Sequence, residues 1–198
     1  MLNRSKFFDA IKSSLYGNKF TQGQVDGLNT ILDACESANV EEKSLAYMLA
    51  TVYHECNKTM QPIKEFGGRN YFLKMYDILG NARKAKELGN LTKGDGAKYF
   101  GRGYVQLTGK YNYEKAGLAI CVNLVDNPDL ALTAKNAADI MIFGMTKGWF
   151  TGKKLSDYFS DDTPDWKNAR RIINGMDKAA LIAGYAELFY AAIKASTE

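Results

Sequence analysis

Apolar side chains recur every three or four positions in the first part of the chain, which is the spacing of amphipathic helices. Two groups precede position 36: Phe7, Phe8, Ile11 and Leu15, and then Val25, Leu28, Ile31, Leu32 and Cys35. Thr21 precedes the second group and is a candidate N-cap. A third group begins near Val40 and leads through Val52 and Tyr53 to the pair His54-Glu55. The pattern therefore predicts three helices, the last of which ends at a glutamate.

The next segment, residues 60–110, is rich in glycine. Nine glycines fall between positions 67 and 109, and this density predicts turns and short extended pieces. Two helical segments are expected within it, at Tyr71–Leu79 and Ala82–Leu88. The stretch Lys98–Leu107 has the aromatic and β-branched content of a strand that glycines interrupt.

Alternation along this predicted strand gives it a polar face. Val105 and Leu107 would point to the core, which leaves Tyr104, Gln106 and Thr108 on the opposite side. An aromatic ring, an amide and a hydroxyl suit sugar rings, because the apolar faces of a sugar can stack and its hydroxyls need donors and acceptors. An edge strand with ordinary surface residues is the alternative interpretation.

Helical patterns return in the last third. A turn at Asn127-Pro128 precedes a helix from Thr133 to about Lys147, and Thr163-Pro164 predicts the start of another toward Ile173. The final segment, Lys178–Ala195, is apolar on nearly every side, which is typical of a centrally buried helix. An exposed, membrane-disrupting C-terminus is the alternative.

This layout predicts one domain over residues 1–198. A helical bundle would comprise residues 1–58 and 109–198, and a Gly-rich lobe would comprise about 59–108. A cleft beside such a lobe is the natural place for a polymer.

The composition excludes several classes of protein. With 46% hydrophobic and 24% charged residues the chain is typical of a globular domain, and no apolar run approaches the length of a membrane span. The net charge of +4 favours anionic partners, but the basic residues are scattered, so we expect no nucleic-acid binding. Three cysteines without metal-ligand spacing indicate reduced thiols. The N-terminus lacks the apolar core of a secretory signal, so we expect synthesis in the cytoplasm.

Two glutamates are the candidates for catalysis. Glu55 ends an apolar helix, where partial removal from water favours the protonated form that a general acid needs. Glu65 follows ten residues later among polar and flexible residues, where a carboxylate stays ionised. Such a pair is what acid/base cleavage of a glycosidic bond requires. Taken alone, each glutamate is better interpreted as a solvated surface charge.

Metal-dependent and nucleophilic mechanisms have little support in the sequence. A zinc-binding HExxH motif needs a histidine at position 58, but Lys58 stands there and His54 is the single histidine. We therefore predict no metal and no cofactor. Attack by Cys56 next to this histidine is disfavoured, because side chains two residues apart on a helix diverge.

Several motifs together resemble the family 19 glycoside hydrolases, which include plant-type chitinases and many bacteriophage endolysins. The resemblance covers about residues 45–176 and rests on His54-Glu55, PIKE at 62–65, FGRGYVQLTGKYNY at 100–113, Asn127-Pro128 and Ile173-Asn174-Gly175. The long aromatic and glycine motif is the most specific of these. The short spacing between the glutamates resembles the compact endolysins more than the chitinases.

The resemblance implies a role for each matching residue. Glu55 would be the general acid, Glu65 the general base, and Thr108 the hydroxyl that helps to position the attacking water. The positions that would line the substrate are His54, Arg102, Tyr104, Gln106, Tyr111, Asn112 and Asn174. Family members often carry a supporting arginine after the Ile-Asn-Gly segment, but none follows Arg171 here, which leaves Arg69 and Arg102 as alternatives.

The resemblance also implies a fold and a function. We expect an α+β, predominantly helical, lysozyme-like fold whose small Gly-rich lobe contains a short β-hairpin. The expected activity is hydrolysis of β-1,4 bonds of bacterial peptidoglycan by an inverting mechanism, as a monomeric endolysin in phage-induced lysis that reaches the wall through a partner pore. An anionic outer-membrane surface is a second candidate partner. A chitinase and a non-catalytic wall-binding protein are the alternative functions.

Overall fold

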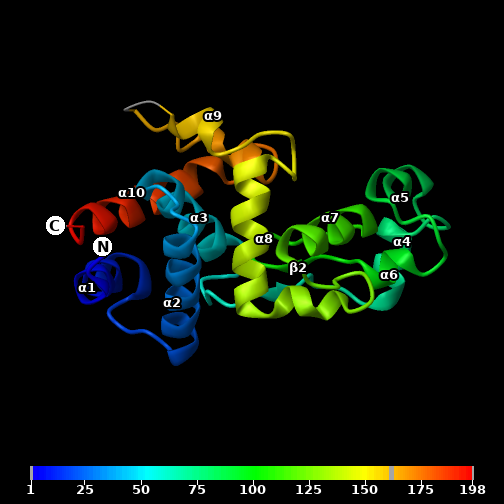
Figure 1. The fold of residues 1–198 in the computed structure, drawn as a ribbon, viewed down its shortest axis with the longest axis horizontal. Helices are drawn as coiled ribbons and strands as arrows, with labels where there is room; N and C mark the ends of the chain where they lie inside the picture. The colour runs from blue at the N-terminus through cyan, green and yellow to red at the C-terminus, as the bar shows by residue number, and fades with distance from the viewer. Residues whose placement is uncertain (1, 161–162, 198) are drawn as a thin grey trace. The chain divides into compact units, whose positions relative to one another are not determined.

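Helices make up most of the structure, a computed structural model that describes residues 2–160 and 163–197 (Figure 1). The chain divides into two compact units. The first unit comprises Met1–Gln61 and Met141–Glu198, and the second comprises Pro62–Ile140. Residues 109–140 therefore group with the Gly-rich segment, whereas the sequence pattern grouped them with the helical bundle.

The first unit contains helices from both ends of the chain. Its elements are α1 (Arg4–Tyr16), α2 (Gln22–Ser37), α3 (Glu42–Glu55), α9 (Ser156–Phe159), the 3-10 helix η2 (Asn168–Ile172) and α10 (Ala179–Lys194). The three N-terminal helices confirm the hydrophobic pattern. Thr21 caps α2 as predicted: its side chain accepts from the Gln24 backbone N–H, and the Gln24 side chain bonds back to the Thr21 N–H. The helix predicted from Thr163-Pro164 is instead a turn followed by η2.

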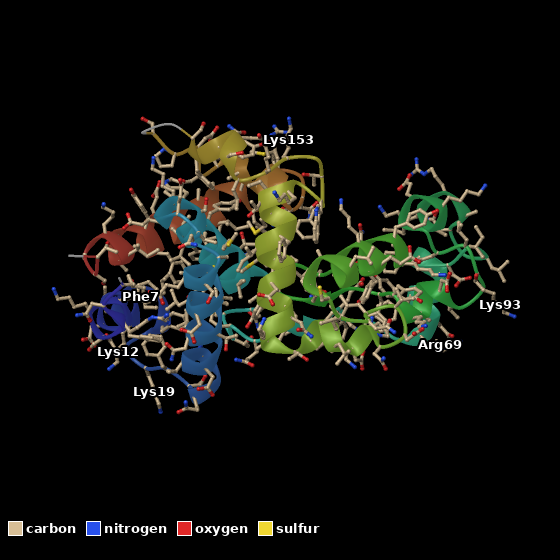
Figure 2. All side chains as sticks on the ribbon, viewed as in Figure 1. Phe7, Lys12, Lys19, Arg69, Lys93 and Lys153 are labelled. Carbon is tan, nitrogen blue, oxygen red and sulfur yellow. The ribbon has the colours of Figure 1, made fainter. Side chains whose placement is uncertain are left out.

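Helix α3 is the central element of this unit. It is buried on nearly every side, and it packs against α10 and α2. The Tyr53 ring meets the Tyr185 and Phe189 rings of α10 edge-on, at centroid distances of 4.8 and 5.9 Å. Phe7 of α1 stacks on Phe189, so α1 closes the same core. Figure 2 shows Lys12 and Lys19 of this unit directed to solvent.

The C-terminal helix α10 is buried on one face only. Leu181 and Leu188 are about half exposed, while Ile182, Ala186 and Phe189 are buried. The prediction of a helix that is enclosed all round was therefore wrong for α10. No helix in the part of the chain that the structure describes has the length and apolar character required to span a membrane.

The second unit carries the strands. Its elements are β1 (Ile63–Lys64), α4 (Arg69–Tyr76), α5 (Ala82–Leu88), α6 (Asp95–Lys98), β2 (Arg102–Gly103), α7 (Lys110–Ile120) and the 3-10 helix η1 (Pro128–Leu132). Helix α8 (Ala134–Lys147) contains the division between the units. The predicted helix at Ala82–Leu88 matches α5, and the one at Tyr71–Leu79 corresponds to α4, which begins and ends earlier.

The sheet is small and antiparallel. Ile63 pairs with Gly103, and Lys64 pairs with Arg102. Arg102 and Leu107 also exchange backbone hydrogen bonds of 3.2 and 2.8 Å, which closes a tight loop over residues 103–106. The interrupted strand expected over Lys98–Leu107 is limited to β2 and this tight loop, and the α+β, predominantly helical fold is confirmed.

Candidate active site

Glu55, the last residue of α3, is paired with a buried arginine. The Arg170 Nη1 donates to Glu55 Oε1 at 2.6 Å, and the Arg170 side chain is 4% exposed against 21% for Glu55. The Arg170 Nε donates to the Asp177 carbonyl at 3.1 Å, which fixes the guanidinium on its other edge. Because the core holds α3 and Arg170 is itself anchored, the Glu55 carboxyl has one defined position with a partly open face.

Three residues considered from the sequence, His54, Asn174 and Cys56, can now be placed in the structure. His54 is half-buried beside Glu55 on α3. Asn174 is exposed, and its backbone N–H donates to the Arg170 carbonyl at 3.0 Å, so the Ile-Asn-Gly turn is tied to the arginine that holds the candidate acid. Burial, with the Glu55 charge, raises the pKa of the Cys56 thiol to about 12. A thiol that stays protonated at neutral pH is a poor nucleophile.

Glu65 directly follows β1 and is held by two donors from its own unit. The Tyr76 hydroxyl donates to Oε1 at 2.7 Å, and the Gly101 backbone N–H donates to Oε2 at 3.0 Å. The Glu65 N–H in turn donates to the Gly101 carbonyl at 2.8 Å. Both carboxyl oxygens therefore accept a hydrogen bond, which fixes the orientation of the Glu65 side chain.

The close approach at Gly101 requires a residue without a side chain. A Cβ built there would lie 2.9 Å from Gln106 Oε1 and 3.0 Å from Glu65 Oε2. With any larger residue at position 101, the Glu65 carboxyl or the Gln106 amide would have to move. Gly101 therefore allows the backbone donor to reach the Glu65 carboxylate.

Three predicted polar residues form a hydrogen-bonded series next to this strand. The Gln106 Nε2 donates to the Ile63 carbonyl at 3.2 Å and to the Gly103 carbonyl at 3.1 Å. The Thr108 Oγ1 donates to the Gln106 carbonyl at 2.8 Å, and the Asn112 Nδ2 donates to the Thr108 carbonyl at 2.6 Å.

All three of these side chains are half-buried. The structure thus brings Gln106, Thr108 and Asn112 together beside β1, the strand that Glu65 follows. Tyr111 is half-exposed, and a Cβ at Gly89 would lie 2.4 Å from its ring, so the ring covers that glycine.

Two predicted substrate-binding residues are buried in the structure. Tyr104 has 0% exposure, because residues 103–106 form a tight loop and the strand alternation that placed Tyr104 beside Gln106 does not apply. Arg102 is 5% exposed; its Nε donates to Asp129 at 2.7 Å, and its Nη1 donates to the Tyr113 hydroxyl at 2.9 Å. The expectation of substrate contact was therefore wrong for Tyr104, whereas that for Arg102, which also lines a pocket, stays a prediction.

Sequence reasoning missed Tyr76 and Asn90. Burial and the hydrogen bond to Glu65 raise the pKa of Tyr76 well above its ordinary value, so the phenol remains a donor. Asn90 is fully buried and bridges two backbone segments: its Nδ2 donates to the Tyr76 carbonyl at 2.9 Å, and its Oδ1 accepts from the Lys110 N–H at 2.9 Å. This bridge fixes the end of α4, which carries Tyr76, against the start of α7.

Arg170 was missed as well, although a signal existed. The family resemblance predicted an arginine after the Ile-Asn-Gly segment, with Arg69 or Arg102 as replacements. Arg170 stands three residues before Ile173, and a search in both directions along the chain would have included it. The supporting arginine of Glu55 is Arg170, while Arg102 pairs with Asp129.

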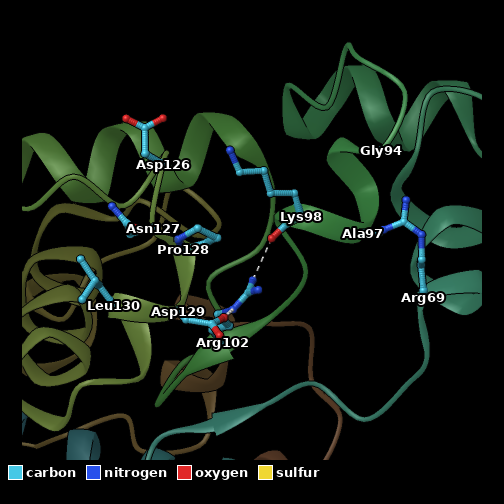
Figure 3. A pocket seen from close by; sticks show the side chains of 10 residues that line it. All are labelled: Arg69, Gly94, Ala97, Lys98, Arg102, Asp126, Asn127, Pro128, Asp129 and Leu130. Carbon is cyan, nitrogen blue, oxygen red and sulfur yellow. Dashed lines mark hydrogen bonds and ion pairs between the residues drawn. The ribbon is translucent and has the colours of Figure 1, made fainter.

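A separate polar pocket of about 650 Å³ lies in the second unit (Figure 3). The hydrogen bonds from Lys64 and Arg102 lower the pKa of Asp129 at its edge. Arg69 lines the opposite side, and neither candidate catalytic carboxyl is among the lining residues. Within residues 2–160 and 163–197, no group of three or more His, Cys, Asp or Glu side chains could hold a metal ion.

Comparisons with known proteins agree on one family. The sequence model of the family 19 glycoside hydrolases, described as class I chitinase, matches residues 25–158. An acidic endochitinase of Petunia hybrida is 33% identical over 110 residues, which are 55% of this chain and 35% of that protein. A basic endochitinase of Vitis vinifera is 49% identical over 55 residues, 28% of this chain and 16% of that protein. The matched segments thus span about a third or less of these relatives.

Solved structures show the same fold at low identity. Chitinase C from Streptomyces griseus HUT6037 superposes with a TM-score of 0.61 and 18% identity, over 98% of this chain and 76% of that one. A bacterial family 19 chitinase gives a TM-score of 0.56 and 20% identity, over 97% of this chain and 94% of that one. Since the family model matches well over half of the sequence, the chain belongs to glycoside hydrolase family 19, the class I chitinases.

Proposed function

We propose that this protein hydrolyses β-1,4 glycosidic bonds of an N-acetylated polysaccharide, with bacterial peptidoglycan as the substrate, by an inverting acid/base mechanism. The observation that carries the proposal is the different support of the two carboxyls. Glu55 has a buried cation as its partner, and Glu65 accepts from a phenol and a backbone N–H. The two carboxyls thus have different partners, a cation for Glu55 and neutral donors for Glu65, and the resemblance to family 19 assigns the acid to Glu55 and the base to Glu65.

Each step of the mechanism has a residue suited to it. Glu55 would donate its proton to the oxygen of the leaving sugar, and Arg170 would stabilise the carboxylate that forms. Glu65 would accept a proton from the water that attacks the anomeric carbon from the opposite face. Inverting glycosidases separate the two carboxyls by about 6.5–9.5 Å to leave room for this water. The Thr108 hydroxyl donates to the Gln106 carbonyl, so its oxygen lone pairs can accept a hydrogen bond from that water.

Glu55→Gln tests the acid directly. The amide can still accept from Arg170 but has no proton of suitable acidity to give, so we expect turnover to fall by about 10²–10⁴-fold while substrate binding persists. Glu41→Gln, an exposed glutamate just before the same helix, is the matched control and should keep full activity. Unchanged turnover in Glu55→Gln would show that Glu55 is not the acid, whereas a wild type that binds the wall but cleaves no glycan would support the non-catalytic alternative.

Product analysis distinguishes between peptidoglycan and chitin as the substrate. The short spacing between Glu55 and Glu65 favours peptidoglycan, by its likeness to compact endolysins, whereas the relatives named endochitinase favour chitin as the second candidate. Purified peptidoglycan and chitin oligosaccharides should be digested in parallel, with mass spectrometry of the products and NMR of the first anomer released. Cleavage of chitin alone would refute the peptidoglycan assignment, and anhydro products would refute hydrolysis.

The biological setting is part of the proposal. A peptidoglycan hydrolase made in a phage-infected cytoplasm would act as a monomer on the cell wall after passage through a partner pore. The net charge of +4 is compatible with contact to an anionic outer-membrane surface. Expression in the bacterial cytoplasm with and without a pore-forming partner tests this: lysis should require both proteins and an intact Glu55.

A further inference from the structure

Phe66 presents a complete aromatic side chain to solvent. It is 100% exposed, and it immediately follows the candidate base Glu65. Isolated exposed apolar residues are common on protein surfaces, and Leu79 and Leu118 are further examples here. Exposure alone therefore carries no meaning. Phe66 differs from the other two because it directly follows Glu65, whose carboxyl is held by two hydrogen-bond donors.

The backbone on both sides of Phe66 is held in place. On one side, the Glu65 N–H donates to the Gly101 carbonyl at 2.8 Å, and the Glu65 carboxylate accepts from Tyr76 and Gly101. On the other side, Gly67 lies against two aromatic rings of α4. A Cβ at Gly67 would be 2.6 Å from Tyr71 Cδ1 and 3.0 Å from Phe72 Cε1. The ring of Phe66 thus stands in water on a backbone with little freedom to move.

Such an arrangement suits a pyranose ring. Aromatic faces carry partial negative charge and offer a large flat apolar area, and the axial C–H bonds of a sugar present a complementary face. A side chain whose backbone is already ordered loses little further entropy on binding. Such a sugar would contact the residue that directly follows the candidate base Glu65 in the chain.

We propose that Phe66 is a stacking platform for an N-acetylhexosamine ring of the substrate, next to Glu65. This inference rests on the proposed function and adds a specificity-determining residue to it. Insertion of Phe66 into an anionic lipid surface is the competing use of an exposed aromatic residue.

Kinetics on the full-length chain give the first test. Phe66→Ala should raise KM for chitin or peptidoglycan oligosaccharides by about ten-fold, the size expected for one aromatic contact. Phe66→Tyr should restore most of the loss. Leu118→Ala is the matched control, since it also removes a largely exposed side chain, at 83% exposure, from the same unit. The thermal midpoints of all three variants should equal that of the wild type. An unchanged KM in Phe66→Ala would overturn the inference.

A binding measurement separates this inference from the proposed activity. Phe66→Trp combined with Glu55→Gln gives an inactive protein with a fluorescent reporter, read after subtraction of the signal of the Glu55→Gln parent. Titration with a chitin hexasaccharide should shift the emission of the introduced tryptophan. A shift in this double variant, together with a wild type that hydrolyses no glycan, would support the platform while refuting the activity. No shift with the glycan, or a shift only with phosphatidylglycerol vesicles, would overturn the platform even if the wild type is an active hydrolase.

Discussion

The contact between Glu55 and Arg170 allows a quantitative prediction. Arg170→Met keeps a side chain of similar length but removes the donor to Glu55 and the donor to the Asp177 carbonyl. A hydrogen bond to a charged group contributes about 1.5–3 kcal/mol, and loss of one partner from a fully buried ion pair costs about 3–5 kcal/mol. Glu55 is 21% exposed, so water would recover part of this loss. We expect Arg170→Met to lower the free energy of unfolding by about 2–4 kcal/mol.

Urea denaturation followed by circular dichroism measures this change, and Arg171→Met is the matched control. Arg171 is the adjacent, exposed arginine, so its loss should change the free energy of unfolding by less than about 0.5 kcal/mol. Arg170→Lys should fall between wild type and Arg170→Met, because an ammonium keeps the charge but lacks the planar fork of donors. Combining Arg170→Met with Glu55→Gln should cost less than the sum of the single changes, by about 0.5–3 kcal/mol.

Turnover should decrease in the same order as stability, from wild type through Arg170→Lys to Arg170→Met. We expect turnover to drop at least about ten-fold in Arg170→Met, equivalent to a barrier higher by 1.4 kcal/mol, because the carboxylate formed on proton donation loses its cation. If Arg170→Met unfolds at the same urea concentration as Arg171→Met and keeps its turnover, Arg170 neither stabilises the fold nor supports the candidate acid.

Three further predictions follow from the second unit. Tyr76→Phe removes the donor to Glu65 Oε1, so kcat should fall about ten-fold with little change in KM; a change in KM alone would contradict a role in positioning the base. Lys64 and Arg102 donate to Asp129 and lower its pKa below the unfolded-state value of 3.8. The ionised carboxylate therefore stabilises the fold fully above the unfolded-state pKa, and this stabilisation is lost as the pH falls through the lower folded-state pKa. Asp129→Asn should therefore be less stable than wild type at pH 7, with the difference disappearing in acid; an equal difference at pH 2 in thermal melts would refute this. A thiol reagent should label Cys121 in the native protein and all three cysteines after denaturation, as intact-mass measurement would show.

Where large apolar residues mark one face, the sequence predicted helices well. The first three helices and α5 appear where the pattern placed them. Helix α7 was not predicted, because its buried face includes small residues: Ala116 and Gly117 are buried, and a Cβ on Gly117 would meet the Val122 carbonyl at 2.6 Å. A pattern of large hydrophobic residues cannot mark a helix that packs through its backbone.

The candidate site was predicted in part. The motif around residues 100–113 placed Gln106, Thr108 and Asn112 together, since they share one short segment with glycines that allow close approach. Tyr104 failed because a loop closed by backbone hydrogen bonds does not alternate its side chains as a strand does. Tyr76 was missed because its importance depends on a tertiary contact, and a single sequence does not show which distant side chains meet; Arg170 was missed because the supporting arginine was expected only after the Ile-Asn-Gly segment.

The partner of Glu55 lies 115 residues further along the chain. During synthesis the ribosome therefore makes the candidate acid long before its counter-ion, and a nascent or truncated product that ends before position 170 has no cation to complete the pair. For a protein that would attack the wall of the cell producing it, this order of translation leaves incomplete chains without a finished proton donor.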